Sequence, residues 1–137
     1  MMVKISIQYE GQLHSKLTHE QSGMVIYTDA PKDNNGKGES FSPTDLVAAA
    51  LGSCMMTIMG IMANRHSINL EGATVDVAKE MVTEPVRRIG KITVTLNMPK
   101  GIPQDKRTML ETAAHACPVH KSLHPDVQTP ITFVYPD

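Results

Sequence analysis

Residues 42–63 read Ser42-Pro-Thr-Asp-Leu-Val-Ala-Ala-Ala-Leu-Gly-Ser-Cys54-Met-Met-Thr-Ile-Met-Gly-Ile-Met-Ala63. The stretch opens with helix-start chemistry, because Ser42 suits the N-cap, Pro43 the first helical position and Asp45 the first turn. From Leu46 to Ala63 it carries no charged side chain. A helix that is apolar all round must be buried on every side. We therefore expect a central core helix with Cys54 in its middle.

The same stretch is long enough to be tested as a membrane span. Its composition argues against one, because Ala, Gly, Ser, Thr and Met stand where typical spans carry Leu, Ile and Phe. Small residues instead favour close packing of a helix against another helix or a sheet. A single chain of this size has little surface with which to cover such a helix, which favours a dimer built around it.

The whole chain, residues 1–137, is of a length that suits one domain with a real core. Its formal net charge is -1 and 20% of its residues are charged, so the composition indicates neither a nucleic-acid nor a membrane partner. Residues 1–8 alternate apolar and polar side chains as a strand does, with no signal-peptide pattern, so we expect a cytoplasmic protein. In that compartment two cysteines are more often catalytic, redox-active or buried thiols than a structural disulfide.

Alternating patterns and turn residues divide the rest of the chain into strands and short helices. An antiparallel meander is expected first, followed by a polar loop over 29–40, the long helix, a second antiparallel pair, a second helix and a final strand. The expected strands cover 3–10, 13–18, 24–28, 73–82, 88–98 and a last stretch with Ile131, Phe133 and Tyr135. Strands in runs rather than in alternation with helices indicate an α+β fold with a largely antiparallel sheet.

The second cysteine lies in His115-Ala-Cys117-Pro-Val-His120-Lys-Ser122. Two histidines and a lysine make an electropositive setting that can lower a thiol pKa. The sequence leaves two positions open for Cys117. At the end of the second helix, which would begin near Ile102, the negative dipole end disfavours a thiolate. As the cap of a short helix that starts at Pro118, the positive end favours it.

Other chemistries are open for these residues. Cys54 taken alone is typical of a buried structural thiol, and the two cysteines do not form a C-x-x-C redox pair. His115, Cys117 and His120 offer three groups that zinc can bind, but their spacing matches no familiar zinc finger. A fourth ligand would have to come from elsewhere in the chain, so we expect no metal at these residues.

Both cysteine motifs resemble those of one family, the OsmC/Ohr proteins. Residues 42–54 are similar to that family's helix start, with Pro, Leu and Ala before the cysteine, and residues 115–123 are similar to its second-cysteine motif, Cys followed by Pro and a short helix. The spacing of the cysteines and the order of strands and helices agree as well. The resemblance implies an intertwined homodimer, with antiparallel sheets wrapped around long central helices and two sites at the dimer interface.

The resemblance also implies a chemistry. Cys54 would be the peroxidatic thiolate that reduces an organic hydroperoxide, such as an alkyl or fatty-acid hydroperoxide, and becomes a sulfenic acid. Cys117 would resolve it as a disulfide, which an external dithiol reductant then restores. The resemblance implies that this chemistry needs no metal and no other bound cofactor. Activating or orienting roles would fall to Thr44, Asp45, His115 and His120. The resulting function would be oxidative-stress defence.

The sequence departs from the family pattern in two respects. Active members carry a Glu directly after the helix-start Pro, which holds an Arg of the meander against the thiolate. Here Thr44 takes that place, Asp45 follows it, and no Arg precedes Arg65. Lys16, His14 or His19 could supply positive charge instead. The alternative prediction is an OsmC-like dimer without peroxidase activity that binds a small apolar ligand or runs other thiol chemistry.

Overall fold

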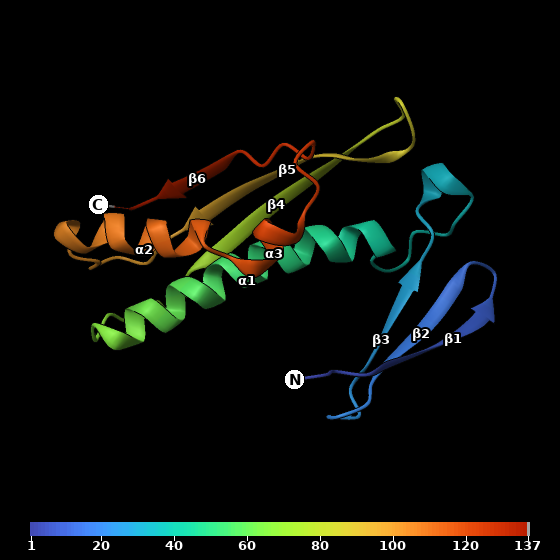
Figure 1. Cartoon of the computed structure of the whole chain (residues 1–137), viewed down its shortest axis with the longest axis horizontal. Helices are drawn as coiled ribbons and strands as arrows, with labels where there is room; N and C mark the ends of the chain where they lie inside the picture. The colour runs from blue at the N-terminus through green and yellow to red at the C-terminus, as the bar shows by residue number, and fades with distance from the viewer. Residues whose placement is uncertain (137) are drawn as a thin grey trace. The chain divides into compact units, whose positions relative to one another are not determined.

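The computed structural model describes residues 1–136. The chain forms two compact units, Met1–Val47 and Ala48–Asp137. Helix α1 (Pro43–Arg65) begins in the first unit and runs through the second (Figure 1). Mixed strands and helices confirm the predicted α+β class.

The first unit contains the predicted meander. Strands β1 (Ile5–Gly11), β2 (His14–His19) and β3 (Val25–Asp29) pair in this order, each antiparallel to its neighbour. The loop that follows holds a single short turn of helix, η1 (Lys32–Asn34). The apolar side chains of β1 alternate as expected, and Ile5, Ile7 and Tyr9 are 59%, 65% and 63% exposed in the single chain.

The start of α1 is fixed by reciprocal hydrogen bonds. The Asp45 backbone N–H donates to Ser42 Oγ at 3.1 Å, and the Ser42 N–H donates to Asp45 Oδ2 at 2.9 Å. Such a capping box satisfies two backbone groups that a helix start otherwise leaves without partners. The predicted helix start is therefore confirmed, and the helix ends at Arg65, two residues beyond the predicted stretch.

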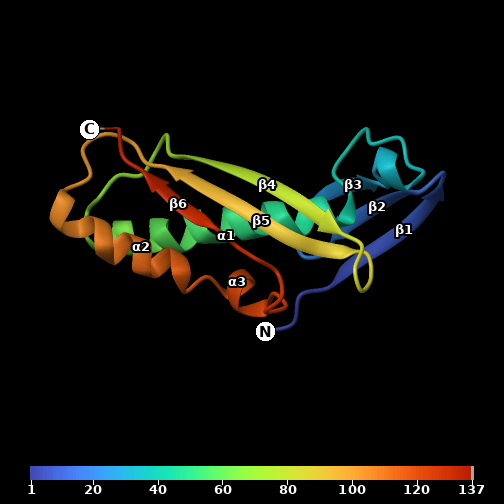
Figure 2. The same cartoon turned by 90° about the horizontal axis from the view of Figure 1, so that it is seen from above.

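A three-stranded sheet forms one layer of the second unit. Strand β5 (Arg88–Asn97) lies between β4 (Thr74–Val82) and β6 (Ile131–Val134), as Figure 2 shows. The β4–β5 pair is antiparallel as predicted, whereas β6 runs parallel to β5. A parallel partner requires a crossover, and the helical segment between β5 and β6 provides it.

That crossover contains three short helices, η2 (Gln104–Lys106), α2 (Arg107–His115) and α3 (Pro118–Ser122). The predicted second helix is therefore shorter than its apolar pattern suggested. Its face includes the buried Leu110 and Ala113, but α2 ends at His115 and Cys117 lies outside it. Pro118 takes the first position of α3, where its missing N–H costs nothing.

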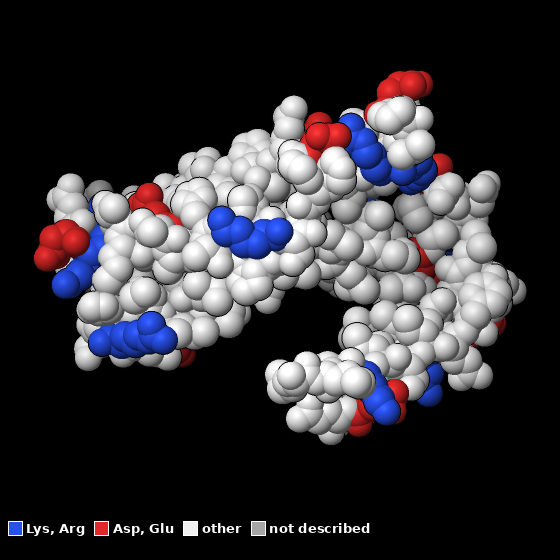
Figure 3. Space-filling view, in the orientation of Figure 1, with Lys and Arg blue, Asp and Glu red and all other residues white. Residues whose placement is uncertain are grey.

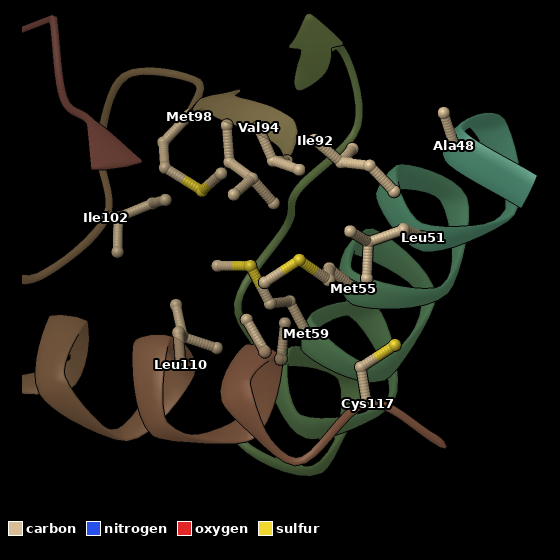
Figure 4. Close-up of a cluster of buried hydrophobic side chains, with 13 residues drawn as sticks. Ala48, Leu51, Met55, Met59, Ile92, Val94, Met98, Ile102, Leu110 and Cys117 are labelled. Carbon is tan, nitrogen blue, oxygen red and sulfur yellow. The ribbon is translucent and has the colours of Figure 1, made fainter. Parts of the chain in front are cut away.

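The core of the second unit lies between α1, the sheet and α2. Leu51, Met55 and Met59 of α1 are fully buried. They join Ile92 and Val94 of β5, Leu110 and Cys117 in one cluster (Figure 4). Gly52 is buried beside these residues, and its lack of a side chain brings α1 close to the β4 valines 75 and 77.

Within the single chain, α1 is buried along one face only, which differs from the predicted burial on every side. Its buried positions, Ala48, Leu51, Gly52, Met55, Met59 and Ala63, recur at helical spacing. Val47 and Ile61 lie outside that face and are exposed. The helix is long and apolar enough to cross a membrane, and 33% of its 18-residue apolar window is buried within the chain. This burial is compatible with a core helix.

Charged side chains do not gather into one basic surface on the face of the molecule seen in Figure 3. Lys and Arg stand there in small groups, some of them beside Asp or Glu. This distribution agrees with the near-neutral net charge of the sequence.

Candidate active site

The second unit brings the two cysteines together. Cys54, in the middle of α1, is half-buried and packs against the core cluster. Cys117, at the start of α3, is fully buried, and the Cys54 thiol is near enough to raise its pKa. Neither sulfur is in a disulfide. Two thiols from elements far apart in sequence thus form one pair in the reduced protein.

The structure settles the position of Cys117 that the sequence left open. Cys117 is the N-cap of α3, and its Sγ accepts the backbone N–H of His120 at 3.5 Å. Figure 4 shows its side chain directed from the α2–α3 junction towards α1. A cysteine thus occupies a position where Ser or Asp would place an oxygen, and its sulfur caps α3 by accepting the His120 backbone N–H.

Opposing effects act on the Cys117 thiol. Burial raises its pKa above the ordinary value, and the hydrogen bond and charge interaction with Cys54 raise it further. The backbone N–H groups of His120 and Val119 act in the opposite direction, because they stabilise the thiolate. The net shift of the Cys117 pKa is upward, which favours the neutral thiol.

The two histidines of the second-cysteine motif have different surroundings. His115 ends α2 and meets the ring of Phe133 edge-on, with centroids 5.9 Å apart. His120 lies in α3, and its Nε2 is 2.9 Å from Thr129 Oγ1. His120 Nδ1 is buried and has no hydrogen-bond partner among residues 1–136. His120 is therefore the histidine that adjoins the cysteine pair, through its backbone amide.

A metal centre does not form from the described side chains. No group of three or more His, Cys, Asp or Glu residues among them is arranged to hold an ion. The alternative zinc site at His115, Cys117 and His120 is thus not assembled in this structure.

Thr44 and Asp45 lie in the first turn of α1, in the first unit. Asp45 takes part in the capping box with Ser42, and Thr44 Oγ1 lies 3.3 Å from Ser42 Oγ. These contacts belong to the helix start. A role for either residue in orienting the thiol stays a prediction.

Two of the three alternative sources of positive charge in the meander, His14 and His19, have hydrogen-bond partners of their own. His14 Nδ1 lies 2.5 Å from Asp29 Oδ1, and its ring stacks on Tyr27. His19 Nδ1 lies 2.7 Å from Ser22 Oγ. His14 and Asp29 also line a cavity of about 300 Å³ within the first unit.

Sequence reasoning missed two partnerships. His14 with Asp29 joins two strands, and His120 with Thr129 joins a helix to the segment before β6. Neither pair has a signal in the sequence, because no periodicity or capping pattern links the partners. Only strand register and the crossover place them together.

The fold and the cysteine motifs agree with a known family. The family model described as OsmC-like protein matches residues 36–132. The chain belongs to the OsmC-like family. The match covers the whole of α1 and the second-cysteine motif, so both halves of the cysteine pair lie within it.

Solved structures support this membership of the OsmC-like family. A protein from Psychrobacter arcticus 273-4, attributed to the osmotic stress induced and detoxification response, is 39% identical, with a TM-score of 0.91 over 97% of this chain and 96% of that chain. An organic hydroperoxide resistance protein OsmC from Legionella pneumophila is 17% identical, with a TM-score of 0.77 over 98% and 97%. An organic hydroperoxide resistance protein from Elizabethkingia anophelis is 16% identical, with a TM-score of 0.75 over 98% and 96%. The latter two show a shared fold. A search among curated proteins finds no match.

Proposed function

We propose that this protein is a thiol peroxidase that reduces organic hydroperoxides in oxidative-stress defence. The observation that carries the proposal is the position of Cys117, whose Sγ caps α3 and whose pKa is raised by the neighbouring Cys54 thiol, with neither cysteine in a disulfide. Two free thiols that are close enough to influence each other's ionisation are candidates for a disulfide, whose bond length is about 2.05 Å. Structural relatives named for organic hydroperoxide resistance support the same class of substrate.

The two cysteines differ in burial, and this difference suggests which one attacks the peroxide and which one forms the disulfide with it. Cys54 is half-buried, whereas Cys117 is fully buried and its pKa is raised. A nucleophile that meets an external peroxide must be accessible and must ionise, so Cys54 suits the attack. Its thiolate takes the terminal peroxide oxygen, the O–O bond breaks, and the leaving alkoxide gains a proton to become an alcohol. Cys54 is left as a sulfenic acid.

Cys117 then resolves the sulfenic acid. Its sulfur attacks the Cys54 sulfur, the S–O bond breaks and water leaves, so that one disulfide replaces one thiol and one sulfenic acid. Two electrons from an external dithiol reductant return both cysteines to thiols. The Met-rich, apolar surroundings of Cys54 (Met55, Met56 and Met59) suit an alkyl chain better than hydrogen peroxide.

A homodimer is part of the proposal. The exposed apolar residues of α1 and of β1 are more than a solvated surface needs, and a second copy of the chain would cover them. Light scattering after gel filtration tests this, and a monomer mass at micromolar concentration would contradict it. A reducing, cytoplasmic location fits two neighbouring thiols that remain unpaired.

Intact mass tests the peroxidase. Reduced protein is treated with one equivalent of cumene hydroperoxide, and we expect a loss of about two hydrogens per chain, as disulfide formation requires. Cys54→Ser abolishes the change. Cys117→Ser instead retains an oxygen at Cys54 that a dimedone probe traps. An unchanged mass in the wild-type protein would contradict the proposal.

A second candidate is an OsmC-like dimer that binds a small apolar ligand or runs other thiol chemistry. The observation that favours it is the engagement of Asp45 in the capping box, together with Thr44 at the position where active members carry Glu. Alkylation of Cys54 as a function of pH separates the candidates. A midpoint near the ordinary thiol value of about 8.5 favours the second, because an activated thiol ionises at lower pH.

A further inference from the structure

The cavity of the first unit lies outside the proposed thiol chemistry. It has a volume of about 300 Å³, and its titratable lining residues are Glu10, His14, Asp29, Lys37 and Glu39. Three carboxylates thus share the space with one imidazole and one ammonium group. A cavity with this balance of charge favours a ligand that carries a positively charged group.

Asp29 fixes the orientation of the His14 ring. Asp29 is only 6% exposed, its Oδ1 lies 2.5 Å from His14 Nδ1, and its Oδ2 accepts the Glu39 backbone N–H at 3.1 Å. The His14 ring also stacks on Tyr27, with centroids 5.3 Å apart. A carboxylate beside Nδ1 favours the tautomer with its proton on that nitrogen, which leaves Nε2 with a lone pair. His14 therefore offers Nε2 as a fixed hydrogen-bond acceptor.

The nearest charged neighbour of His14 Nε2 is a second acceptor. Glu10 Oε1 lies 3.4 Å from it, farther than the usual N–H···O distance of about 2.7–3.2 Å. Two acceptors at this separation are stabilised by a donor that reaches both. A primary ammonium group carries three N–H donors and a positive charge, so it can donate to Nε2 and to the carboxylate together.

Lys37 defines a second point of recognition in the same cavity. Its side chain is exposed and lines the cavity together with Glu10 and His14. A lysine ammonium attracts a carboxylate. We propose that this cavity binds a small α-amino acid, with the ligand's ammonium group between Glu10 and His14 and its carboxylate towards Lys37. The binding is non-covalent and does not depend on the proposed peroxidase.

Other small ligands fit these groups less well. An anion without an ammonium group would meet the carboxylates of Glu10 and Glu39 with no compensating charge of its own. A metal ion is disfavoured because no group of three or more His, Cys, Asp or Glu residues within residues 1–136 is arranged to hold one. The zwitterion matches both signs of charge in the lining.

The test uses the full-length, reduced protein and three probes. L-alanine carries both charged groups, methylamine only the ammonium group and acetate only the carboxylate. Binding is followed by proton NMR of the His14 ring, whose signals are assigned by their loss in His14→Gln. We expect saturable shifts with L-alanine at millimolar concentration, weaker binding of methylamine, and no binding of acetate.

Variants at the two ends of the cavity separate the two contacts. Glu10→Gln should weaken binding of L-alanine at least about tenfold, because a charged acceptor is lost. Lys37→Gln should weaken L-alanine about fivefold, as expected for an exposed ion pair, and should leave methylamine unchanged. The matched control is Glu20→Gln in the same unit, whose carboxylate accepts the Ser6 hydroxyl at 2.8 Å and does not line this cavity. It should bind L-alanine as the wild type does.

Several outcomes would overturn the inference. These are the absence of saturable shifts with L-alanine, binding of acetate as tight as that of L-alanine, or an unchanged affinity in Glu10→Gln with its fold intact by circular dichroism. Equal loss of L-alanine binding in Glu10→Gln and Glu20→Gln would also overturn it, because the effect would then be one of general charge. Since the cysteines take no part in this binding, a protein that binds L-alanine as described but leaves cumene hydroperoxide unreacted would support the inference and refute only the peroxidase.

Discussion

A Cβ atom added at Gly52 would lie 2.7 Å from Val77 Cγ2 and 3.1 Å from Val75 Cγ1. The distance to Val77 is shorter than real Cβ contacts essentially ever are, so α1 approaches β4 as closely as its glycine allows. Because Gly52 and Cys54 lie on the same helix, this close packing of α1 on β4 also determines how near Cys54 lies to the sheet.

Gly52→Ala is therefore expected to destabilise the protein by about 1–3 kcal/mol, the usual cost of overpacking. Urea denaturation followed by circular dichroism measures the change. The double variant Gly52→Ala, Val77→Ala should recover part of the loss, because the clashing methyl group is gone. Gly60→Ala is the control on the same helix, where an added Cβ meets no described atom within 4 Å, and it should not lose stability.

The surroundings of Tyr135 predict how the stability of the protein changes in alkaline solution. Its hydroxyl donates to Glu111 Oε2 at 2.7 Å, and Arg107 lies over its ring at 4.1 Å. Burial, and then the bond to Glu111, raise the pKa of Tyr135 well above the ordinary value. A raised folded-state pKa gives stability that is full below the unfolded pKa, near 10, and is lost as pH rises beyond it.

We therefore expect the stability difference between wild type and Tyr135→Phe to be constant at neutral pH and to shrink above about pH 10. At neutral pH the variant should lose about 1.5–3 kcal/mol, because its hydrogen bond to a charged acceptor is missing. Urea denaturation at several pH values checks both statements. A difference that grows with pH would contradict this account of the Tyr135–Glu111 pair.

The cysteines should differ in their reaction with iodoacetamide. Cys54 is partly accessible, whereas Cys117 is buried and its pKa is raised. Peptide mapping at neutral pH should show modification of Cys54 first. In Cys54→Ala the hydrogen bond and charge that raise the pKa of Cys117 are absent, so its alkylation midpoint should move to lower pH. An unchanged midpoint would mean that burial alone determines the ionisation of Cys117.

Substitution of Asp45 tests whether this residue only caps α1 or also orients the Cys54 thiol. Asp45→Ala removes the carboxylate that accepts the Ser42 N–H, and Ser42→Ala removes the other half of the box. Each should cost about 0.5–2 kcal/mol of stability in thermal denaturation. If capping is the role of Asp45, hydroperoxide reduction per folded protein should be unchanged in both variants. A selective loss of activity in Asp45→Ala would instead indicate that it orients the thiol.

Structural features that depend only on neighbouring residues in the sequence, such as a helix start or a strand, were predicted well. The Ser-Pro-x-Asp start of α1 and the alternation in β1 and β5 depend on neighbours a few residues away, which the sequence shows directly. The first helix and the strand order are confirmed for this reason. The resemblance of the two cysteine motifs gave the family, which the family model confirms.

Features set by distant contacts were not predictable in the same way. The apolar pattern of α2 runs on to Cys117, but Pro118 and the turn before it end that helix at His115. The parallel direction of β6 follows from the crossover, which no residue of β6 encodes. The partnership of His120 and Thr129 depends in turn on that strand's register.

The parallel pairing of β5 and β6 also determines when the second sheet can be completed during synthesis of the chain. Val94 pairs with Ile131, so the second sheet is completed only after the segment that carries Cys117 has left the ribosome. Before this closure, no strand holds Thr129 and nothing fixes the imidazole of His120. The newly made chain thus carries both cysteines before it carries the strand that completes the second sheet.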